Sequence, residues 1–243
     1  MFFISFSYFF ERKYAVLRFY DYLCRINVNK WEMKKVITLI CAVLLTVCVE
    51  GKSLRDLWIS MPDSLVPTLD KNLRTEFVEL QDMKVKSEVT NLLGGTSVMD
   101  TITTDFLQVK MSAAATLQIK LLPQAEGDSL LCVVKTVSAP EKDSELMFYD
   151  QQWRPLDAKT YFGGRDLSGI LESLIAKPDT MNETKFLELK SMIEPKMMSA
   201  ILFEHDQSIV FRLSTPLLSA EDKKKVSTIK VQRKFNWNGK IFN

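Results

Sequence analysis

Few residues in this 243-residue chain could do chemistry, and the first to consider is its single histidine, His205. A hydrolytic triad needs a general base, usually a histidine, that a carboxylate orients against a nucleophile. His205 stands between Glu204 and Asp206 in the polar segment FEHDQS, which is typical of a tight turn between two strands. We therefore interpret His205 as a solvated turn residue and not as a catalytic base.

Metal and cofactor sites need ligands that the chain hardly offers. A zinc site takes three or four cysteine, histidine or acidic ligands, but after residue 51 the chain has one histidine and one cysteine, Cys132. Cys132 lies in the apolar run LLCVV, which predicts core packing. The pairs Gly94-Gly95 and Gly163-Gly164 lack the lysine and hydroxyl residue of a phosphate-binding loop and indicate turns. The sequence predicts no metal and no cofactor.

Two carboxylates could still perform acid–base hydrolysis, as they do in glycosidases. The acidic residues here are scattered and no spacing pairs them; those considered are Glu76, Glu79, Asp82, Glu126, Asp128, Glu141 and Asp143. We therefore predict a protein that is not an enzyme and has no catalytic residues. A carboxylate-based hydrolase stays an alternative.

Four residues are candidates for an interface with another molecule: Tyr149, Trp153, Arg233 and Trp237. Aromatic and arginine side chains carry much of the affinity in protein interfaces. Both tryptophans follow polar residues near the end of a predicted strand series, so packing at the edge of the core is the other interpretation. Arg233 falls on the apolar face of the alternating segment 229–237, where a guanidinium needs an internal partner or an open edge.

The run Lys223-Lys224-Lys225 directly follows Glu221-Asp222. A solvated helix end or turn explains such a run, whereas an anionic glycan or lipid surface is the functional alternative. This alternative would use the same aromatic residues together with the three lysines.

The chain contains what looks like a second start at Met33, MKKVITLICAVLLTVCVEGKS. Two lysines precede a 14-residue run, Val36 to Val49, that is apolar except for two threonines. This run is too short to cross a bilayer, which takes about 20 apolar residues, and Val49 and Gly51 occupy the small-residue positions that a signal peptidase recognises. We predict a signal peptide at 33–51, cut after Gly51, with residues 1–32 as a mis-assigned upstream leader. A lipoprotein cut before Cys48 is the alternative.

Export to the periplasm or cell envelope follows from that prediction, with no membrane span in the mature chain. Seven of the 32 basic residues and four of the 30 acidic residues lie before residue 52, so 25 and 26 remain. A nearly neutral mature chain carries no basic surface that would indicate nucleic-acid binding.

The remaining chain predicts an α+β fold built as a tandem repeat of helices packed on an antiparallel meander; one larger α+β domain whose halves match by chance is the alternative. The first repeat, 52–156, begins with apolar residues at helical spacing over 54–77 and continues as strands from about residue 89 to Tyr149. The second repeat, 157–243, has helical patterns at 165–177 and 185–193, then short strands around 199–204, 208–214 and 226–237. The segment 216–225 is expected to be a loop.

Four segments are similar to a known family: MPDSLVPTLDKNLR at 61–74, NLLGG at 91–95, KLLP at 120–123 and VVKTVSAPEKDSELMFYDQQWRPL at 133–156. They resemble secreted proteins of unknown function from Bacteroides-like Gram-negative bacteria. The resemblance implies export and a tandem layout similar to that of β-lactamase inhibitor proteins, and it carries over no site residue. Together with the lack of reactive groups, it favours a non-catalytic protein-binding module of the cell envelope.

Overall fold

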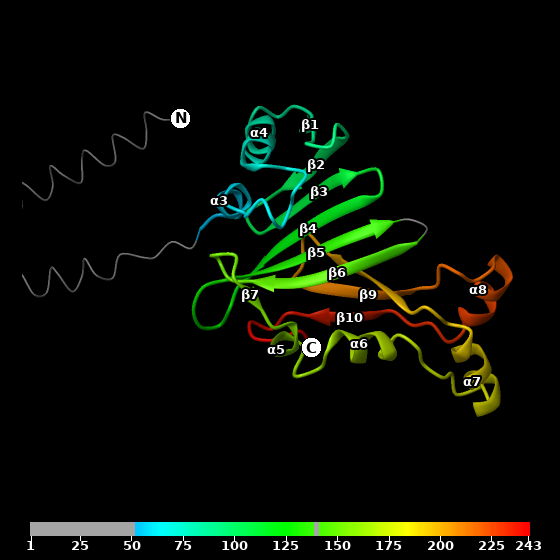
Figure 1. Cartoon of the computed structure of the whole chain (residues 1–243). Coiled ribbons are helices and arrows are strands. Elements are labelled where there is room, and N and C mark those ends of the chain that lie inside the picture. The colour runs from blue at the N-terminus through cyan, green and yellow to red at the C-terminus, as the bar shows by residue number, and fades with distance from the viewer. Residues whose placement is uncertain (1–51, 139–140) are drawn as a thin grey trace, which may run out of the picture. The chain divides into compact units, whose positions relative to one another are not determined.

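The computed structural model describes residues 52–138 and 141–243 (Figure 1). Residues from Gly51 to Asn243 form one compact unit. The predicted leader at 1–32 and the predicted signal peptide at 33–51 lie outside the described residues.

Seven antiparallel strands in sequence order form the large sheet. The strands are β1 (Glu88–Thr90), β2 (Thr96–Ile102), β3 (Phe106–Ser112), β4 (Ala115–Leu122), β5 (Leu130–Ser138), β6 (Lys142–Tyr149) and β7 (Pro155–Leu156). The central strand β5 is buried on both faces over Leu130–Val134, as its unbroken apolar run predicts. The sheet therefore has to be covered on two sides.

Two short helices cover one face of the large sheet. These are α3 (Leu54–Ile59) and α4 (Lys71–Asp82), whose first turns are capped by the side chains of Ser53 and Asp70. Their apolar residues pack on alternate residues of the sheet, such as Val109, Leu117 and Ile119. Because side chains alternate between the two faces of a strand, the neighbours of these residues along each strand point toward the opposite face of the sheet.

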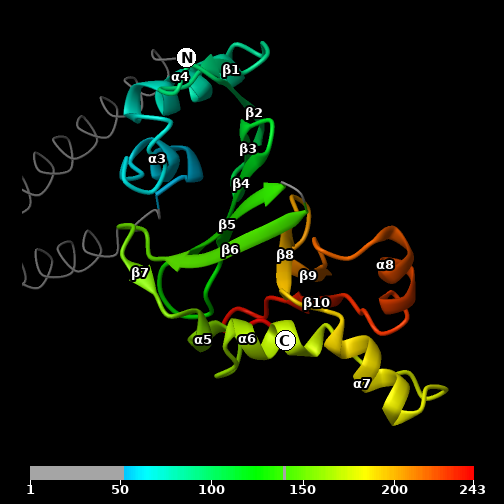
Figure 2. The ribbon, with the colours of Figure 1, turned by 45° about the vertical axis from the view of Figure 1, so that its right-hand side comes forward.

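A second, three-stranded sheet covers that opposite face, with the strand order β10-β9-β8. It contains β8 (Met197–Leu202), β9 (Ser208–Ser214) and β10 (Arg233–Asn236), and the helices around it are α5 (Ala158–Tyr161), α6 (Leu167–Ser173), α7 (Glu183–Ser191) and α8 (Ala220–Val226). Figure 2 shows α3 and α4 on one side of the large sheet and the small sheet on the other.

The edge strand β8 is held against the face of the large sheet by side chains. The amide of Gln118 on β4 accepts a hydrogen bond from Leu202 N–H at 3.0 Å and donates to Leu202 C=O at 3.3 Å. Ser144 Oγ on β6 accepts from Ala200 N–H at 2.9 Å. Lys120, only 2% exposed, donates to the carbonyl of Glu204 and pairs with Asp105, each at 2.8 Å. These contacts satisfy backbone groups that an unpaired edge would leave open.

The α+β class is confirmed, but the tandem repeat is not. The first half supplies a seven-stranded sheet and the second a three-stranded one. One core combines Phe106, Cys132 and Phe148 from the first half with Phe211 and Phe235 from the second. The division near residues 156 and 157 stays a prediction, since the two sides share this core.

Three local predictions are corrected by the structure. The helical spacing predicted over 54–77 is interrupted between α3 and Lys71, the first residue of α4, because residues 62–69 form consecutive turns. The expected loop 216–225 contains α8, which starts at a Ser219 cap with Glu221 and Asp222 in its first turn. The predicted strand 226–237 is reduced to Arg233–Asn236 and isolated bridges at Lys230 and Trp237.

Candidate docking site

Tyr149 and Trp153, two of the four interface candidates, are buried in the core beneath α3 and α4. Trp153 is 7% exposed, and its indole N–H donates to Leu57 C=O at the end of α3, at 3.1 Å. The Tyr149 ring lies 5.5 Å from it, centroid to centroid, and burial raises the pKa of the Tyr149 hydroxyl. Both side chains join the sheet to α3 and offer little surface to a partner.

Trp237 is also buried, whereas Arg233 is exposed. The indole N–H of Trp237, at 7% exposure, donates to Pro123 C=O at 2.6 Å. Arg233 lies on the outer strand β10, and its Nε donates to Ser173 C=O at 3.2 Å. The structure does not bring the four candidates into one surface.

The residues considered for catalysis are placed as the sequence predicts. His205 is exposed in the turn between β8 and β9. Cys132 is fully buried on β5, and this burial raises the pKa of its thiol. Among the described residues, no three His, Cys, Asp or Glu side chains are grouped so as to hold a metal ion.

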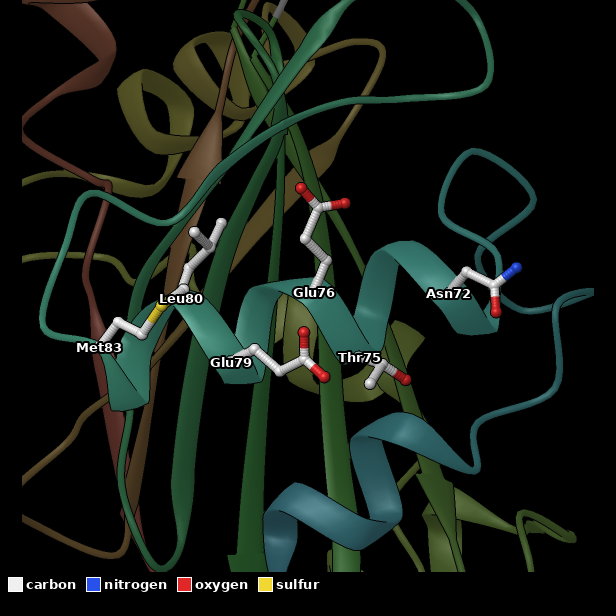
Figure 3. A pocket seen from close by; sticks show the side chains of 6 residues that line it. All are labelled: Asn72, Thr75, Glu76, Glu79, Leu80 and Met83. Atoms are coloured by element: carbon white, nitrogen blue, oxygen red, sulfur yellow. The ribbon is translucent and has the colours of Figure 1, made fainter.

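Glu76 and Glu79 lie together on the exposed face of α4 (Figure 3). The side chains that accompany them are Asn72, Thr75, Leu80 and Met83. All six come from a single helix and its C-terminal cap, so the described residues supply one wall and do not enclose a substrate. This face offers no second element from which a paired carboxylate could act on a substrate.

The lysine run at the end of α8 is mostly paired. Lys223 binds the carboxylate of Glu141, which directly precedes β6, and Lys225 binds both Glu221 and Asp222 at 3.0 and 3.1 Å. The hydrogen bond from Lys223 lowers the pKa of Glu141. Most of the positive charge that the glycan or lipid alternative needs is thus neutralised within the fold.

A small apolar cleft lies at the edge of the α3/α4 side of the large sheet. Its volume is about 200 Å³, and its walls come from the turns at 65–68, the β1–β2 turn, the β3–β4 hairpin and strand β5. The lining residues are Leu65, Val66, Pro67, Thr68, Asn91, Leu93, Met111, Ser112, Ala115, Leu117 and Lys135. Because most of these side chains are apolar, the cleft is suited to an apolar group.

The wall formed by residues 65–68 is positioned by a buried arginine of α4. Arg74 is 1% exposed, and its guanidinium donates to Leu69 C=O at 2.5 Å and to Met61 C=O. The same guanidinium pairs with Asp63 at 2.8 Å. A buried charge needs such partners, and here they fix both ends of the turn segment that borders the cleft.

A second wall of the cleft is the turn at residues 91–95, here named the leucine turn. Buried Asn91 accepts hydrogen bonds from Leu93 N–H and Gly95 N–H, both at 3.1 Å, and donates to Ser97 Oγ at 3.0 Å. Gly94 has φ +77°, which only glycine adopts without strain. The leucine turn is therefore held in one conformation.

The leucine turn nevertheless exposes its two leucines, Leu93 at 82% and Leu92 at 59%. Leu92 N–H donates to Thr68 C=O at 3.0 Å, and Asn91 Nδ2 donates to Met111 C=O at 3.3 Å. The turn is thus tied to the two neighbouring walls of the cleft. Exposed apolar side chains on a fixed turn are typical of a contact surface.

Among the described residues that line the cleft, Lys135 has the one charged side chain. It lies on β5 directly across from Glu145 on β6 and from Leu117 on β4. Among the described residues, Lys135 forms no ion pair, although Glu145 is its cross-strand neighbour. The cleft therefore combines an apolar floor with an ammonium group that a visiting carboxylate could reach.

These residues were not among those predicted from the sequence. Gly94-Gly95 is predicted to be a turn, but no role is predicted for the leucines before it. A usable signal was present, because two consecutive leucines in a turn are unusual where polar residues prevail. The sequence around Lys135 and Arg74 does not indicate their roles, because the residues that surround each side chain in the fold come from other segments of the chain.

Among residues 52–138 and 141–243, no helix combines the length and the apolar character that crossing a membrane requires. Residues 46–242 match the family described as "Protein of unknown function (DUF3256)". No curated protein matches the chain.

A solved structure is similar in fold: a domain of an uncharacterized protein from Porphyromonas gingivalis W83. The TM-score is 0.65 at 20% identity, and the match covers 78% of this chain and 98% of that one. The predicted resemblance to a family of unknown function is thereby confirmed. The secretion and the inhibitor-like layout that it implied stay predictions.

Proposed function

The chain belongs to the DUF3256 family of proteins of unknown function, and we propose that it is a non-catalytic protein that binds another protein through the cleft and the leucine turn. The observation that carries the proposal is the exposure of Leu92 and Leu93 on a turn fixed by buried Asn91. Single exposed leucines are common on protein surfaces. Two of them on a rigid turn beside an apolar cleft form a preorganised contact surface, which reduces the entropy lost on binding.

Export to the periplasm or cell envelope is part of the proposal. It is supported by the apolar run Val36 to Val49 behind two lysines and by Val49 and Gly51 at the small-residue positions of a signal-peptidase site. A single buried cysteine after residue 51 leaves the exported chain without an intramolecular disulfide. On this view the protein acts by contact, as an inhibitor or an assembly factor does.

The two alternatives have less support. A glycan or lipid binder using Lys223–Lys225 would have to break the pairs that two of these lysines form with Glu141, Glu221 and Asp222. A carboxylate-based hydrolase would need two carboxylates facing one substrate, and Glu76 and Glu79 share one exposed helix face instead. The docking surface requires neither change.

The test is a crosslinking experiment in envelope extracts of the native host. The full chain, its Leu93→Asp variant and a matched Leu217→Asp control are compared by quantitative mass spectrometry. Leu217 is 75% exposed, close to the 82% of Leu93, but lies outside the cleft. We expect one defined protein to be crosslinked by the unchanged chain and by Leu217→Asp, and to be lost with Leu93→Asp.

The result that would contradict the proposal is equal capture of the same proteins by all three chains. Hydrolysis of a substrate in esterase, protease, glycosidase or phosphatase assays would also contradict it, provided that the activity is lost on Glu76→Gln or Glu79→Gln. Circular dichroism of each variant serves as the control that the chain is folded in every comparison.

A further inference from the structure

We infer that the cleft accepts one apolar side chain of the partner while Lys135 binds an adjacent carboxylate, so that the recognised segment is both apolar and acidic. This inference rests on the proposed function and adds to it the chemistry of the partner. It also assigns a separate role to each part of the cleft: the walls select an apolar group and Lys135 selects its neighbour.

The size of the cleft limits the occupant to a single side chain. Pockets for drug-sized ligands measure roughly 300–1,000 Å³, whereas this cleft has about 200 Å³. A dry cavity of about 150 Å³ holds a benzene ring. One leucine, methionine or phenylalanine side chain therefore fits, with its backbone running past the rim formed by Leu93 and Pro67.

The charge at the cleft favours an acidic neighbour. Lys135 lines the cleft and forms no ion pair within the described part of the chain, while its cross-strand neighbour Glu145 does not engage it. Attraction between two charges strengthens as water is removed around them. A partner that covers the cleft therefore gains from placing a carboxylate beside Lys135 and loses from placing a lysine or arginine there.

A protein segment suits this surface better than a lipid bilayer. Recognition of anionic lipids takes clusters of about four to eight basic residues beside the membrane, and the cleft lining contains only Lys135. The apolar lining is concave and can receive a side chain, and the leucine turn presents two strongly exposed leucines beside it.

The experiment selects a phage-displayed library of random peptides, about 12 residues long, on the immobilised full chain. Four baits are used in parallel: the unchanged chain, Lys135→Glu, Leu93→Asp and the control Lys224→Glu. Lys224 is a second exposed lysine that forms no ion pair with any described residue, and it lies outside the cleft. Circular dichroism and thermal unfolding verify that all four baits are folded.

We expect the unchanged chain and Lys224→Glu to enrich peptides that carry an apolar residue within about two positions of an aspartate or glutamate. Lys135→Glu should enrich lysine or arginine in place of the acidic residue, and Leu93→Asp should enrich neither class. For a synthetic peptide of the first class, Lys135→Gln should weaken binding about fivefold, the upper range for an exposed ion pair. The loss should shrink at high salt.

The inference about Lys135 is overturned, while the proposed function stands, if Leu93→Asp abolishes enrichment but Lys135→Glu still enriches the same acidic peptides as the unchanged chain. In that case the apolar docking function stands and Lys135 has no part in selection. If no bait enriches any class while Leu93→Asp still abolishes crosslinking to the native partner, the linear-segment inference is likewise wrong. Co-sedimentation with phosphatidylglycerol vesicles that is lost with Leu93→Asp would overturn both proposals, because the leucine turn would then bind lipid.

Discussion

Gln118 carries a contact on which the assembly of the two sheets depends, and its removal should be costly. Its amide is the partner of both Leu202 N–H, at 3.0 Å, and Leu202 C=O, at 3.3 Å, on the edge of β8. Leu202 is 2% exposed, so little water can replace the lost side chain. A buried donor left without a partner costs about 1–3 kcal/mol. We therefore expect Gln118→Ala to lower the free energy of unfolding by about 2–3 kcal/mol.

The matched control is Gln108→Ala. Gln118 Nε2 also donates to Gln108 Oε1 at 2.8 Å, so both substitutions break that contact, but Gln108→Ala leaves Leu202 paired. Gln108 lies on the half-exposed part of the large sheet, and its substitution should cost less than about 1 kcal/mol. Gln108→Ala also removes the exposed hydrogen bond from Gln108 Nε2 to Asp100 at 2.9 Å, so the difference between the two variants is a lower limit on the contribution of the Leu202 contacts.

The variant Gln118→Glu adds a pH signature. An ionised glutamate still accepts from Leu202 N–H but repels Leu202 C=O, to which the amide donated. A protonated glutamate restores the donor, so the folded state favours protonation and raises the pKa of this residue. The stabilising contribution is present below the unfolded pKa and is lost as the pH rises through the folded pKa. Gln118→Glu should therefore be nearly as stable as the unchanged chain at about pH 4 and clearly less stable at about pH 7.

The assay is guanidinium unfolding followed by circular dichroism and tryptophan fluorescence. Trp58 and Trp153 report on the core beneath α3 and α4, and Trp237 reports on the core shared with the small sheet. Equal stabilities of Gln118→Ala and Gln108→Ala, within about 0.5 kcal/mol, would refute the reasoning. So would a Gln118→Glu variant whose stability does not change between about pH 4 and pH 7.

Four further predictions concern stability, pH and processing. Lys84 follows the C-terminal cap of α4 and has φ +56°, a left-handed conformation that glycine adopts without strain. Lys84→Gly should therefore raise the free energy of unfolding by about 0.5–1 kcal/mol, whereas Lys84→Ala should not. Equal effects of the two substitutions in denaturant unfolding would contradict this. Trp153→Ala should lower the free energy of unfolding by about 3–5 kcal/mol, because the side chain is buried. A loss below about 1 kcal/mol would show that Trp153 contributes little to the core and would support its role at an interface. The hydrogen bond from Lys223 lowers the pKa of Glu141 below its ordinary value of 4.5. The ionised Glu141 therefore stabilises the fold above pH 4.5, and this stabilisation is lost as the pH falls through the lower folded pKa. Glu141→Gln should reduce the loss of stability that thermal unfolding measures between about pH 5 and pH 3. N-terminal sequencing of protein exported by the native host should begin near Lys52, and a start within residues 1–32 would contradict the predicted signal peptide.

Much of the local structure could be predicted from the sequence because it depends on neighbours along the chain. The alternation Leu117, Ile119, Leu121 predicts β4, and the apolar run around Cys132 predicts a strand buried on both faces; both agree with the structure. His205 is in the predicted turn, and the α+β class follows from the order of these elements. Such patterns report the period of the backbone, which is about 2 in a strand and about 3.6 in a helix.

The failures came where a local pattern was compatible with two structures. The segment 216–225 is polar with a proline, which suggests a loop, yet Ser219 caps a helix there. The repeated order of strands and turns in the two halves suggested a tandem repeat, but the order of elements does not determine how many strands each sheet takes. Trp153 and Trp237 carry the same sequence signal whether they face a core or a partner.

By itself the sequence determined the α+β class, most of the segments that form strands, and where most turns fall. Only the tertiary structure decided which surface is open. Asn91 connects the leucine turn by a hydrogen bond to Met111, 20 residues away in the sequence, and Gln118 binds Leu202, 84 residues away. Burial depends on such distant contacts, so a side chain such as Leu93 is known to be exposed only when every neighbouring element is in place.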